Sequence, residues 1–425
     1  MLNRRDFLKS VGAVAAGSTL AGAFSDRAIA AQARGHVVVV GGGFGGATAA
    51  KYLRMWSDGG VRVTLVERQR EFISCPISNL VVGGVRQLAD ITVGYDNLRD
   101  KWGVEIVHDE VVGIDVGKRE IRLANGDSLT YDRAIVAPGI DFLWDDVPGL
   151  AGNEDTIPHA WKAGPQTMLL RKQLEEMPAG GVYAMHIPMA PYRCPPGPYE
   201  RACVIANFLK THKPGAKALI LDANPDIQSK KGLFMKAFEE RYGDIIEYRP
   251  NSRLLSVDAA NRKAELEFSE VTADVLNVIP PMRAGRIVDH LGVSLINDRW
   301  VDVDYQTMEA KGAPGVHVVG DAIFPAPQMP KSGHLANQQA KVAASAVLNL
   351  LAGTPPNPSP VVMNTCYSFV DATHVVHVAS VHQFDTAQHT FLPVEGAGGL
   401  SPAPTELEGQ YAHAWSRNIW ADMLA

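Results

Sequence analysis

Cysteine is scarce in this chain of 425 residues, which contains only Cys75, Cys194, Cys203 and Cys366. The separations between them match neither a paired zinc motif nor the dense disulfide framework of a small secreted scaffold. The sequence also lacks a C-x-x-C-H motif, so no c-type haem is expected on this chain. Each cysteine therefore has to be explained from its own surroundings.

Long hydrophobic runs and an excess of basic residues are missing too. No stretch of about 18 or more apolar residues occurs, so no membrane span is expected. The formal net charge of -6 gives no electrostatic reason to bind nucleic acid. With 46% hydrophobic residues, the chain is too apolar for disorder and too long for one ordinary core, which predicts two or three domains.

Residues 1–30 have the composition of a targeting segment. The adjacent Arg4 and Arg5 precede a weakly apolar stretch from Val11 to Phe24, and small residues at 28–30 offer a cleavage site. This order resembles a twin-arginine export signal, which carries proteins already folded around a cofactor. We therefore expect a periplasmic protein, the alternative being a frayed amphipathic terminus.

A dinucleotide-binding turn follows directly. A buried strand at residues 36–40 leads into a glycine-rich turn and then into a helix-favouring segment. Gly41 permits the tight turn, Gly43 lets a pyrophosphate approach the backbone, and Gly46 lets the helix pack on the strand. Glu67 ends the next predicted strand, where a carboxylate would accept hydrogen bonds from adenosine ribose hydroxyls.

Two later segments favour FAD over NAD. Residues 131–139 and 315–321 resemble the second and third FAD motifs of the flavoproteins with two dinucleotide domains. The resemblance implies that Gly139 borders the cofactor and that Asp321 holds the ribityl chain. It also places Val111 against the adenine, although a plain strand valine is the alternative. A helix from about Leu335 to Leu351 would direct its N-terminus at the flavin.

The segment 151–271 predicts a second dinucleotide fold without its glycine motif. Strands are expected at 181–187 and 216–221 and a helix at 199–209. The turn at 188–198 is rich in proline and bulky residues, which denies a pyrophosphate close approach. NAD(P) is therefore not expected here.

From their surroundings alone, the cysteines leave alternatives open. Cys75 has no C-x4-C partner, so it is either a core side chain or a covalent tether to a flavin. Cys194 and Cys366 occupy loop-like stretches, and could form a disulfide that is structural or redox-active, or remain buried thiols. Cys203 lies in the middle of a predicted helix and is expected to be buried and inert.

Taken together, these motifs resemble the flavoprotein subunit of flavocytochrome c sulfide dehydrogenase, a relative of sulfide:quinone oxidoreductase. The resemblance implies that Cys75 bonds the flavin 8α-methyl group and that Cys194 and Cys366 are a redox pair. It implies a carboxylate beside that pair at Glu200, which alone would be a helix-start acid. Trp420 would pack near the flavin.

The same resemblance implies an α/β fold with two Rossmann-like domains, as in glutathione reductase, and a C-terminal α+β interface domain. The expected FAD domain is discontinuous, at 36–150 and 272–352, with the second domain at 151–271 and the interface domain at 361–425. The implied activity is oxidation of hydrosulfide to FAD through Cys194 and Cys366, with a c-type cytochrome subunit as acceptor in a heterodimer. Alternatives are a sulfide:quinone oxidoreductase, or an electron-transfer subunit with structural cysteines. The sequence leaves open which cysteine is attacked, although Cys366 is preferred as the one nearer the flavin.

Beyond a proline-rich linker at 353–360, the C-terminal segment predicts strands and one helix. Four histidines have spacings unlike a metal site, so we expect exposed strand faces and no metal: His374, His377, His382 and His389. Glu406 to Leu424 is expected to be helical and to pack a stripe of four residues on its own core: Leu407, Tyr411, Trp415 and Ile419.

Overall fold

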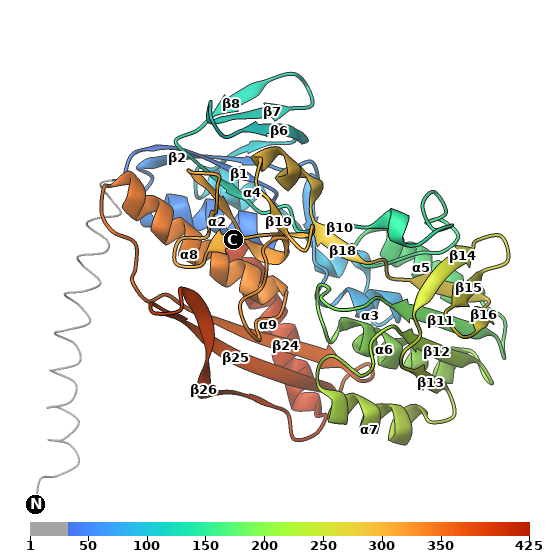
Figure 1. Ribbon diagram of the computed structural model, residues 1–425. Coiled ribbons are helices and arrows are strands. Elements are labelled where there is room, and N and C mark those ends of the chain that lie inside the picture. Colours follow the sequence, from blue (N-terminus) through green and yellow to red (C-terminus); the bar gives the residue numbers. More distant parts are fainter. Residues whose placement is uncertain (1–32) are drawn as a thin grey trace, which may run out of the picture.

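The first layer of the protein is a seven-stranded sheet. The computed structural model describes residues 33–425, so the predicted export segment at 1–30 lies outside the described residues. Two helices, α2 (Phe44–Trp56) and α8 (Gly333–Leu351), pack together beside this sheet (Figure 1). In sheet order the strands are β21 (Val303–Asp304), β22 (Glu309–Ala310), β23 (Val316–Val318), β9 (Arg133–Val136), β1 (Gly35–Val40), β2 (Val61–Val66) and β5 (Glu105–Val107).

This sheet is parallel from β23 to β5. Its central strand β1 carries four consecutive valines, because a parallel strand covered on both faces needs apolar side chains on both. It combines strands from both segments that were expected to form one FAD domain. The same two segments also contain shorter elements: β3 (Glu71–Ile73), α3 (Ser78–Val82), β4 (Thr92–Gly94), α4 (Asp96–Asp100), β6 (Val111–Asp115), β7 (Glu120–Leu123), β8 (Ser128–Thr130), β10 (Ile140–Phe142), β18 (Met282–Ala284), β19 (Leu295–Ile296) and β20 (Trp300–Val301).

The middle of the chain forms a second, four-stranded parallel sheet. The predicted helix at 199–209 is present and extends over Gly197–His212, and both predicted strands are found within one residue. Its strands in sheet order are β13 (Ile246–Arg249), β12 (Lys217–Asp222), β11 (Val182–Ile187) and β17 (Val275–Val278). The accompanying elements are α5 (Pro165–Glu176), α6 (Gly197–His212), α7 (Lys231–Tyr242), β14 (Leu254–Asp258), β15 (Lys263–Leu266) and β16 (Glu270–Thr272).

The C-terminal part is an antiparallel sheet and a helix that lie below α8 in the view of Figure 1. The three strands are β24 (Val361–Phe369), β25 (Val375–Asp385) and β26 (Thr390–Leu400). The helix α9 (Glu406–Leu424) has the predicted bounds. The sheet contacts α8 and α9 and, through β24, the middle helix α6. Strand β24 therefore brings Cys366 toward both preceding units.

Two expectations for this C-terminal part are wrong in part. Of the stripe expected on α9, Ile419 is buried and Trp415 packs against the core. Leu407 and Tyr411 are instead 54% and 51% exposed, because the helix turns a face through Ala412, Ser416 and Met423 to the core. His382 is fully buried and not on an exposed strand face, because it pairs with the equally buried Val362 on the inner side of β24 and β25.

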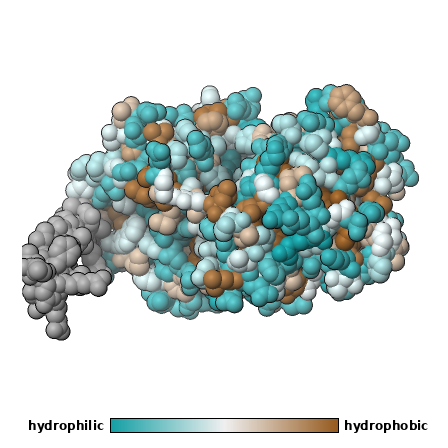
Figure 2. Space-filling view, turned by 90° about the horizontal axis from the view of Figure 1, so that it is seen from below, coloured by the Kyte–Doolittle hydropathy of each residue, from teal (hydrophilic) through white to brown (hydrophobic). Residues whose placement is uncertain are grey.

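The described helices include none long and apolar enough to cross a membrane. Figure 2, which views the molecule from below, shows hydrophobic residues in small groups among hydrophilic ones on the described part of this face. Exposed apolar residues scattered in this way are ordinary on a protein surface.

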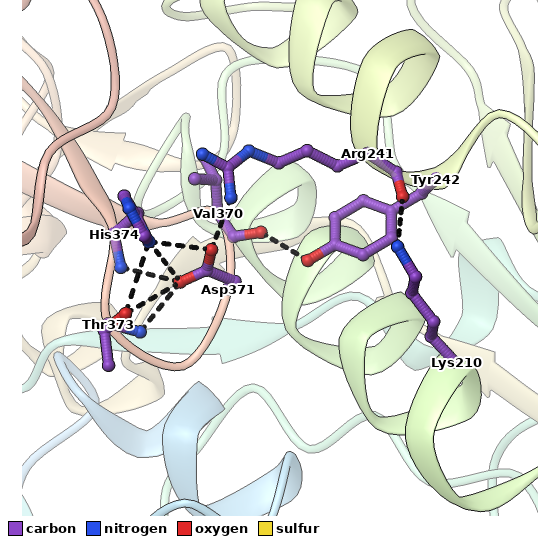
Figure 3. Close-up of polar contacts among 7 residues, drawn as sticks. All are labelled: Lys210, Arg241, Tyr242, Val370, Asp371, Thr373 and His374. Carbon is purple, nitrogen blue, oxygen red and sulfur yellow. Dashed lines mark hydrogen bonds and ion pairs between the residues drawn. The ribbon is translucent and has the colours of Figure 1, made fainter.

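The middle and C-terminal parts are joined by polar contacts at the end of α7 (Figure 3). Arg241 forms an ion pair with Asp371 in the β24–β25 turn, and the Tyr242 hydroxyl donates to the Val370 carbonyl at 2.7 Å. Burial alone would raise the pKa of Asp371, but backbone N–H groups of His374 and Thr373, with the charges of His374 and Arg241, hold it below its usual value. These contacts hold α7 against the sheet that carries Cys366.

Replacing Arg241 with Met should destabilise the protein by about 1 kcal/mol at neutral pH, because the ion pair is only partly buried. The folded pKa of Asp371 is depressed, so its contribution is present above the unfolded pKa of about 4 and is lost as pH falls through the folded value. Denaturant unfolding at several pH values measures this. Lys236→Met, which removes an exposed pair with Glu240, is the matched control and should change little.

Candidate active site

Of the three motif glycines in the turn after β1, Gly41 and Gly46 are tightly packed and Gly43 is open. Gly41 has a φ of +92°, and a Cβ there would lie 2.5 Å from the Ala137 carbonyl oxygen. A Cβ on Gly46 would lie 1.7 Å from the Gly41 carbonyl oxygen, so helix and turn can meet only at glycine. A Cβ on Gly43 would meet nothing within 4 Å. The open side of the turn, at Gly43, faces a cleft.

This cleft, of about 420 Å³, runs from the turn toward Cys75, and Gly139 lines it as well. The Glu67 carboxylate lies in it and accepts hydrogen bonds from the N–H groups of Gly42 at 2.6 Å and Gln69 at 2.8 Å. Asp321, in the turn after β23, is buried, and its Oδ1 has no hydrogen-bond partner among the described residues. Burial raises the pKa of Asp321, although the charges of Arg193 and Lys331 oppose the rise. A buried, unpaired acceptor in a cleft suits a ligand with hydroxyl groups, so these residues fit a dinucleotide that carries a polyol chain.

Two residues expected at this cofactor site do not line the cleft. Val111 is at the start of β6, paired with Leu123, and does not line the cleft. Trp420 packs in the hydrophobic core and lines none of the cavities described here, because α9 turns it away from the side that carries Trp415. Trp415 lines the neighbouring cavity with Cys366. Neither tryptophan lines the cleft at the glycine turn, so the position of Trp420 near the flavin stays a prediction.

Cys75 lies in the wall between this cleft and a second cavity, and lines both. Its Sγ is within hydrogen-bonding distance of the Ala163 N–H, at 3.4 Å, and of Arg193 Nη2, at 3.5 Å. It also lies 3.7 Å from the Trp161 carbonyl oxygen. The thiol is thus held at the end of the cleft by polar groups of Ala163, Arg193 and Trp161.

The second cavity, of about 90 Å³, brings Cys194 and Cys366 together from different parts of the chain. Cys194 precedes α6 with a φ of +60°, and its N–H donates to the Lys331 carbonyl at 2.9 Å. Cys366 lies in β24, where Asn364 Nδ2 donates to its Sγ at 3.3 Å. Both are unbonded thiols in this structure. Burial raises the pKa of each, and the Lys230 ammonium opposes the rise for both.

Glu200, in the first turn of α6, is buried and lines this cavity. Its Oε1 accepts from the Phe369 N–H at 2.9 Å, and its Oε2 accepts from Asn79 Nδ2 at 2.8 Å. Burial raises the pKa of Glu200, while these two hydrogen bonds moderate the rise. The carboxyl group is therefore fixed beside the two thiols with its proton affinity increased.

The remaining expectations concern the second turn and Cys203. The turn at 188–198 delivers Cys194 and then starts α6 at Gly197, where a Cβ would lie 2.9 Å from Cys194 Sγ. Cys203 is fully buried in α6, as expected, and burial raises its pKa well above the usual value. Sequence reasoning missed Arg193 and Lys230. Arg193 could have been noticed from its place beside Cys194, but no motif surrounds Lys230.

Comparison with known proteins agrees with this geometry. Residues 167–280 match the family model "Sulfide dehydrogenase (flavocytochrome c) flavoprotein chain, central", and residues 358–424 match "Flavocytochrome c sulphide dehydrogenase, flavin-binding". The flavoprotein chain of sulfide dehydrogenase (flavocytochrome c) from Chlorobaculum thiosulfatiphilum is 62% identical over 45 residues, which are 11% of this chain and 92% of that one. The chain belongs to the flavocytochrome c sulfide dehydrogenase flavoprotein family.

Two further family models match other parts of this chain. Residues 35–174 match "Pyridine nucleotide-disulphide oxidoreductase", which agrees with the predicted glutathione-reductase-like fold. Residues 1–21 match a twin-arginine translocation signal, which indicates export and is consistent with the predicted periplasmic location.

More distant relatives are sulfide:quinone oxidoreductases. The mouse mitochondrial protein is 26% identical over 308 residues, which are 67% of this chain and 65% of that one. The match to the Dictyostelium discoideum protein covers 64% of that protein. The chain therefore spans slightly less than two thirds of the length of both relatives. The crystal structure of sulfide:quinone oxidoreductase from Aquifex aeolicus superposes with a TM-score of 0.73 at 19% identity and covers 91% of each chain, which shows the shared fold.

Proposed function

We propose that this chain is the flavoprotein subunit of a periplasmic sulfide dehydrogenase, which oxidises hydrosulfide through a Cys194–Cys366 redox disulfide to FAD and passes electrons to a c-type cytochrome. The observation that carries the proposal is the cavity that Cys194 and Cys366 share with Glu200, separated from the flavin cleft by Cys75. Membership of the family supports the same activity.

The residues of the first cleft suit FAD. The turn at Gly41, Gly43 and Gly46 would receive the pyrophosphate, Glu67 the adenosine ribose and Asp321 the ribityl hydroxyls. When bound, FAD would accept two electrons from the reduced cysteine pair and release them one at a time to a haem protein.

The cysteine pair would perform the sulfur chemistry. Hydrosulfide attacks one sulfur of the disulfide, which forms a persulfide on that cysteine and releases the other as a thiolate. The confined volume of the cavity suits a small anion over a bulky thiol. Glu200, whose pKa is raised by burial, would take up the proton that hydrogen sulfide or the persulfide releases.

The acceptor decides between the proposed activity and the second candidate, a sulfide:quinone oxidoreductase, which the distant relatives favour. Purified protein with bound flavin is treated with sulfide without oxygen and then mixed with either a c-type cytochrome or a soluble quinone. We expect sulfide to bleach the flavin and the cytochrome to restore it faster. Faster reoxidation by quinone would favour the second candidate, and a flavin that sulfide leaves oxidised would indicate an electron-transfer subunit with structural cysteines.

We also propose that Cys75 forms a thioether with the flavin 8α-methyl group. Its position at the end of the cleft, with the Ala163 N–H and Arg193 beside the sulfur, supports this. Acid precipitation should leave the flavin in the pellet of the wild-type protein, whereas Cys75→Ala should release it into the supernatant. Cys203→Ala, at a buried thiol outside both cavities, should behave as wild type. Release of all flavin from the wild type would contradict the tether.

A further inference from the structure

The mechanism above assigns no role to the buried ammonium group of Lys230, which lies beside Cys366. Lys230 immediately precedes α7, but its side chain crosses to the C-terminal sheet. Its Nζ donates to the Cys366 carbonyl at 2.9 Å, to Ser368 Oγ at 2.8 Å and to the Val376 carbonyl at 3.3 Å. These acceptors are all uncharged.

A buried cation is costly unless an anion compensates it. Among the described residues, no carboxylate oxygen forms an ion pair with Lys230. The buried carboxylate that lines the cysteine cavity, Glu200, already accepts from Asn79 and Phe369. Burial lowers the pKa of Lys230 to about 8, with opposing contributions from Cys366, Glu200, Cys194 and Glu408, so the group is largely charged at neutral pH. A negative charge on Cys366 would supply the missing counterion.

The two sulfurs of the pair have different surroundings. Cys366 Sγ accepts from Asn364 Nδ2 at 3.3 Å, and the Lys230 ammonium donates to the backbone carbonyl of Cys366. For Cys194 Sγ, the described residues provide no hydrogen-bond donor. Arg193, the cation next to it in sequence, opposes the rise in the pKa of Cys194, but its guanidinium is hydrogen-bonded to the Trp161 carbonyl and the Cys75 sulfur and not to Cys194 Sγ. The polar contacts therefore favour negative charge on Cys366.

Lys230 is also held firmly in place. Its φ of +56° fixes the turn into α7, and its ammonium is bound at three points. At the other end of the helix, Arg241 and Tyr242 bind the β24–β25 turn (Figure 3). With α7 attached to the sheet at both ends, the charge cannot move away from Cys366 without breaking several hydrogen bonds.

We propose that Lys230 is a positioning residue that makes Cys366 the thiolate when the Cys194–Cys366 disulfide opens, and so directs hydrosulfide to Cys194. The inference rests on the proposed function. The hydrosulfide sulfur forms a bond to Cys194 Sγ, the bond between the two cysteines breaks, and its electron pair remains on Cys366 Sγ. The hydrosulfide sulfur is oxidised to the sulfane level, the disulfide is reduced by two electrons, and the proton stays on the persulfide until a base accepts it.

The first test locates the persulfide in the wild-type protein. Full-length protein with bound flavin is mixed anaerobically with one equivalent of sulfide, trapped with an alkylating reagent, digested and analysed by mass spectrometry. We expect the additional sulfur on the Cys194 peptide. Additional sulfur on the Cys366 peptide would overturn the inference, whereas a flavin that sulfide does not bleach and a pair that gains no sulfur would overturn the proposed function itself.

The second test removes the charge. In Lys230→Met, alkylation of Cys366 in the reduced protein should require a higher pH, and sulfide should bleach the flavin at least about tenfold more slowly. Lys230→Arg should largely restore both properties. Lys231→Met, which removes the exposed neighbouring charge paired with Asp226, should match wild type. An unchanged alkylation profile in Lys230→Met would overturn the inference. If Lys230→Met does not fold, Lys230→Arg and the persulfide location still decide.

Discussion

Sulfide should reduce the flavin of a Cys194→Ser variant at least about 10³-fold more slowly than that of the wild type, because the first chemical step needs a disulfide that a serine cannot form. The substitution exchanges one sulfur for one oxygen at a residue whose Sγ has no hydrogen-bond donor among the described residues, so the fold should persist. Anaerobic stopped-flow measurement of flavin absorbance after mixing with sulfide gives the rate directly.

Cys203→Ala is the matched control for this experiment. Cys203 lies in the same helix that follows Cys194, but it is fully buried and does not line the cavity of the redox pair. Its replacement should leave the bleaching rate unchanged. The void that the missing sulfur leaves in the core should cause at most a small loss of stability. Equal bleaching rates for wild type and Cys194→Ser would exclude the disulfide mechanism and leave direct attack of sulfide on the flavin.

Sequence reasoning predicted best those features that depend on residues close together in the chain. The glycine turn at Gly41, Gly43 and Gly46 is local, because strand, turn and helix follow one another within about 20 residues. The bounds of α9 also follow from local signals, since Thr405 caps the helix by accepting a hydrogen bond from the Glu408 N–H.

Features set by tertiary packing were harder to predict. The apolar stripe on α9 gave Leu407 and Tyr411 as core residues, but the sheet covers the neighbouring face of small residues, among them Ala412. The same rotation explains why Trp415 lines the cavity and Trp420 does not. A period of 3.6 residues places side chains relative to one another, whereas only packing decides which side faces inward.

Residues that contact one another around the cysteine cavity were the hardest to predict from the sequence. Lys230 and Cys366 are 136 positions apart, and nothing near Ser229 or Lys231 distinguishes a buried lysine from a surface one. Glu200 was found because the family resemblance pointed to it, but its hydrogen bonds to Asn79 and Phe369 join three parts of the chain. Contacts of this kind follow from the fold and not from spacing.

The second large predicted effect concerns the glycine turn, where one glycine is needed for folding and another for cofactor binding. In Gly46→Ala the new Cβ would lie 1.7 Å from a backbone oxygen of Gly41, and neither backbone can move without separating α2 from β1. We expect destabilisation of about 3 kcal/mol or more and little folded protein. Thermal unfolding of the purified variant, or its absence from the soluble fraction, measures this.

Gly43→Ala separates binding from folding. Its Cβ would meet no protein atom within 4 Å, and Gly43 already has an extended conformation that alanine can adopt. The added methyl group therefore projects into the cleft where the pyrophosphate would approach, and should lower the flavin-to-protein ratio while far-ultraviolet circular dichroism stays unchanged. A Gly43→Ala variant with full flavin content would show that the phosphates do not approach the backbone at this glycine. The cofactor would then have to be bound in this cleft in a different position.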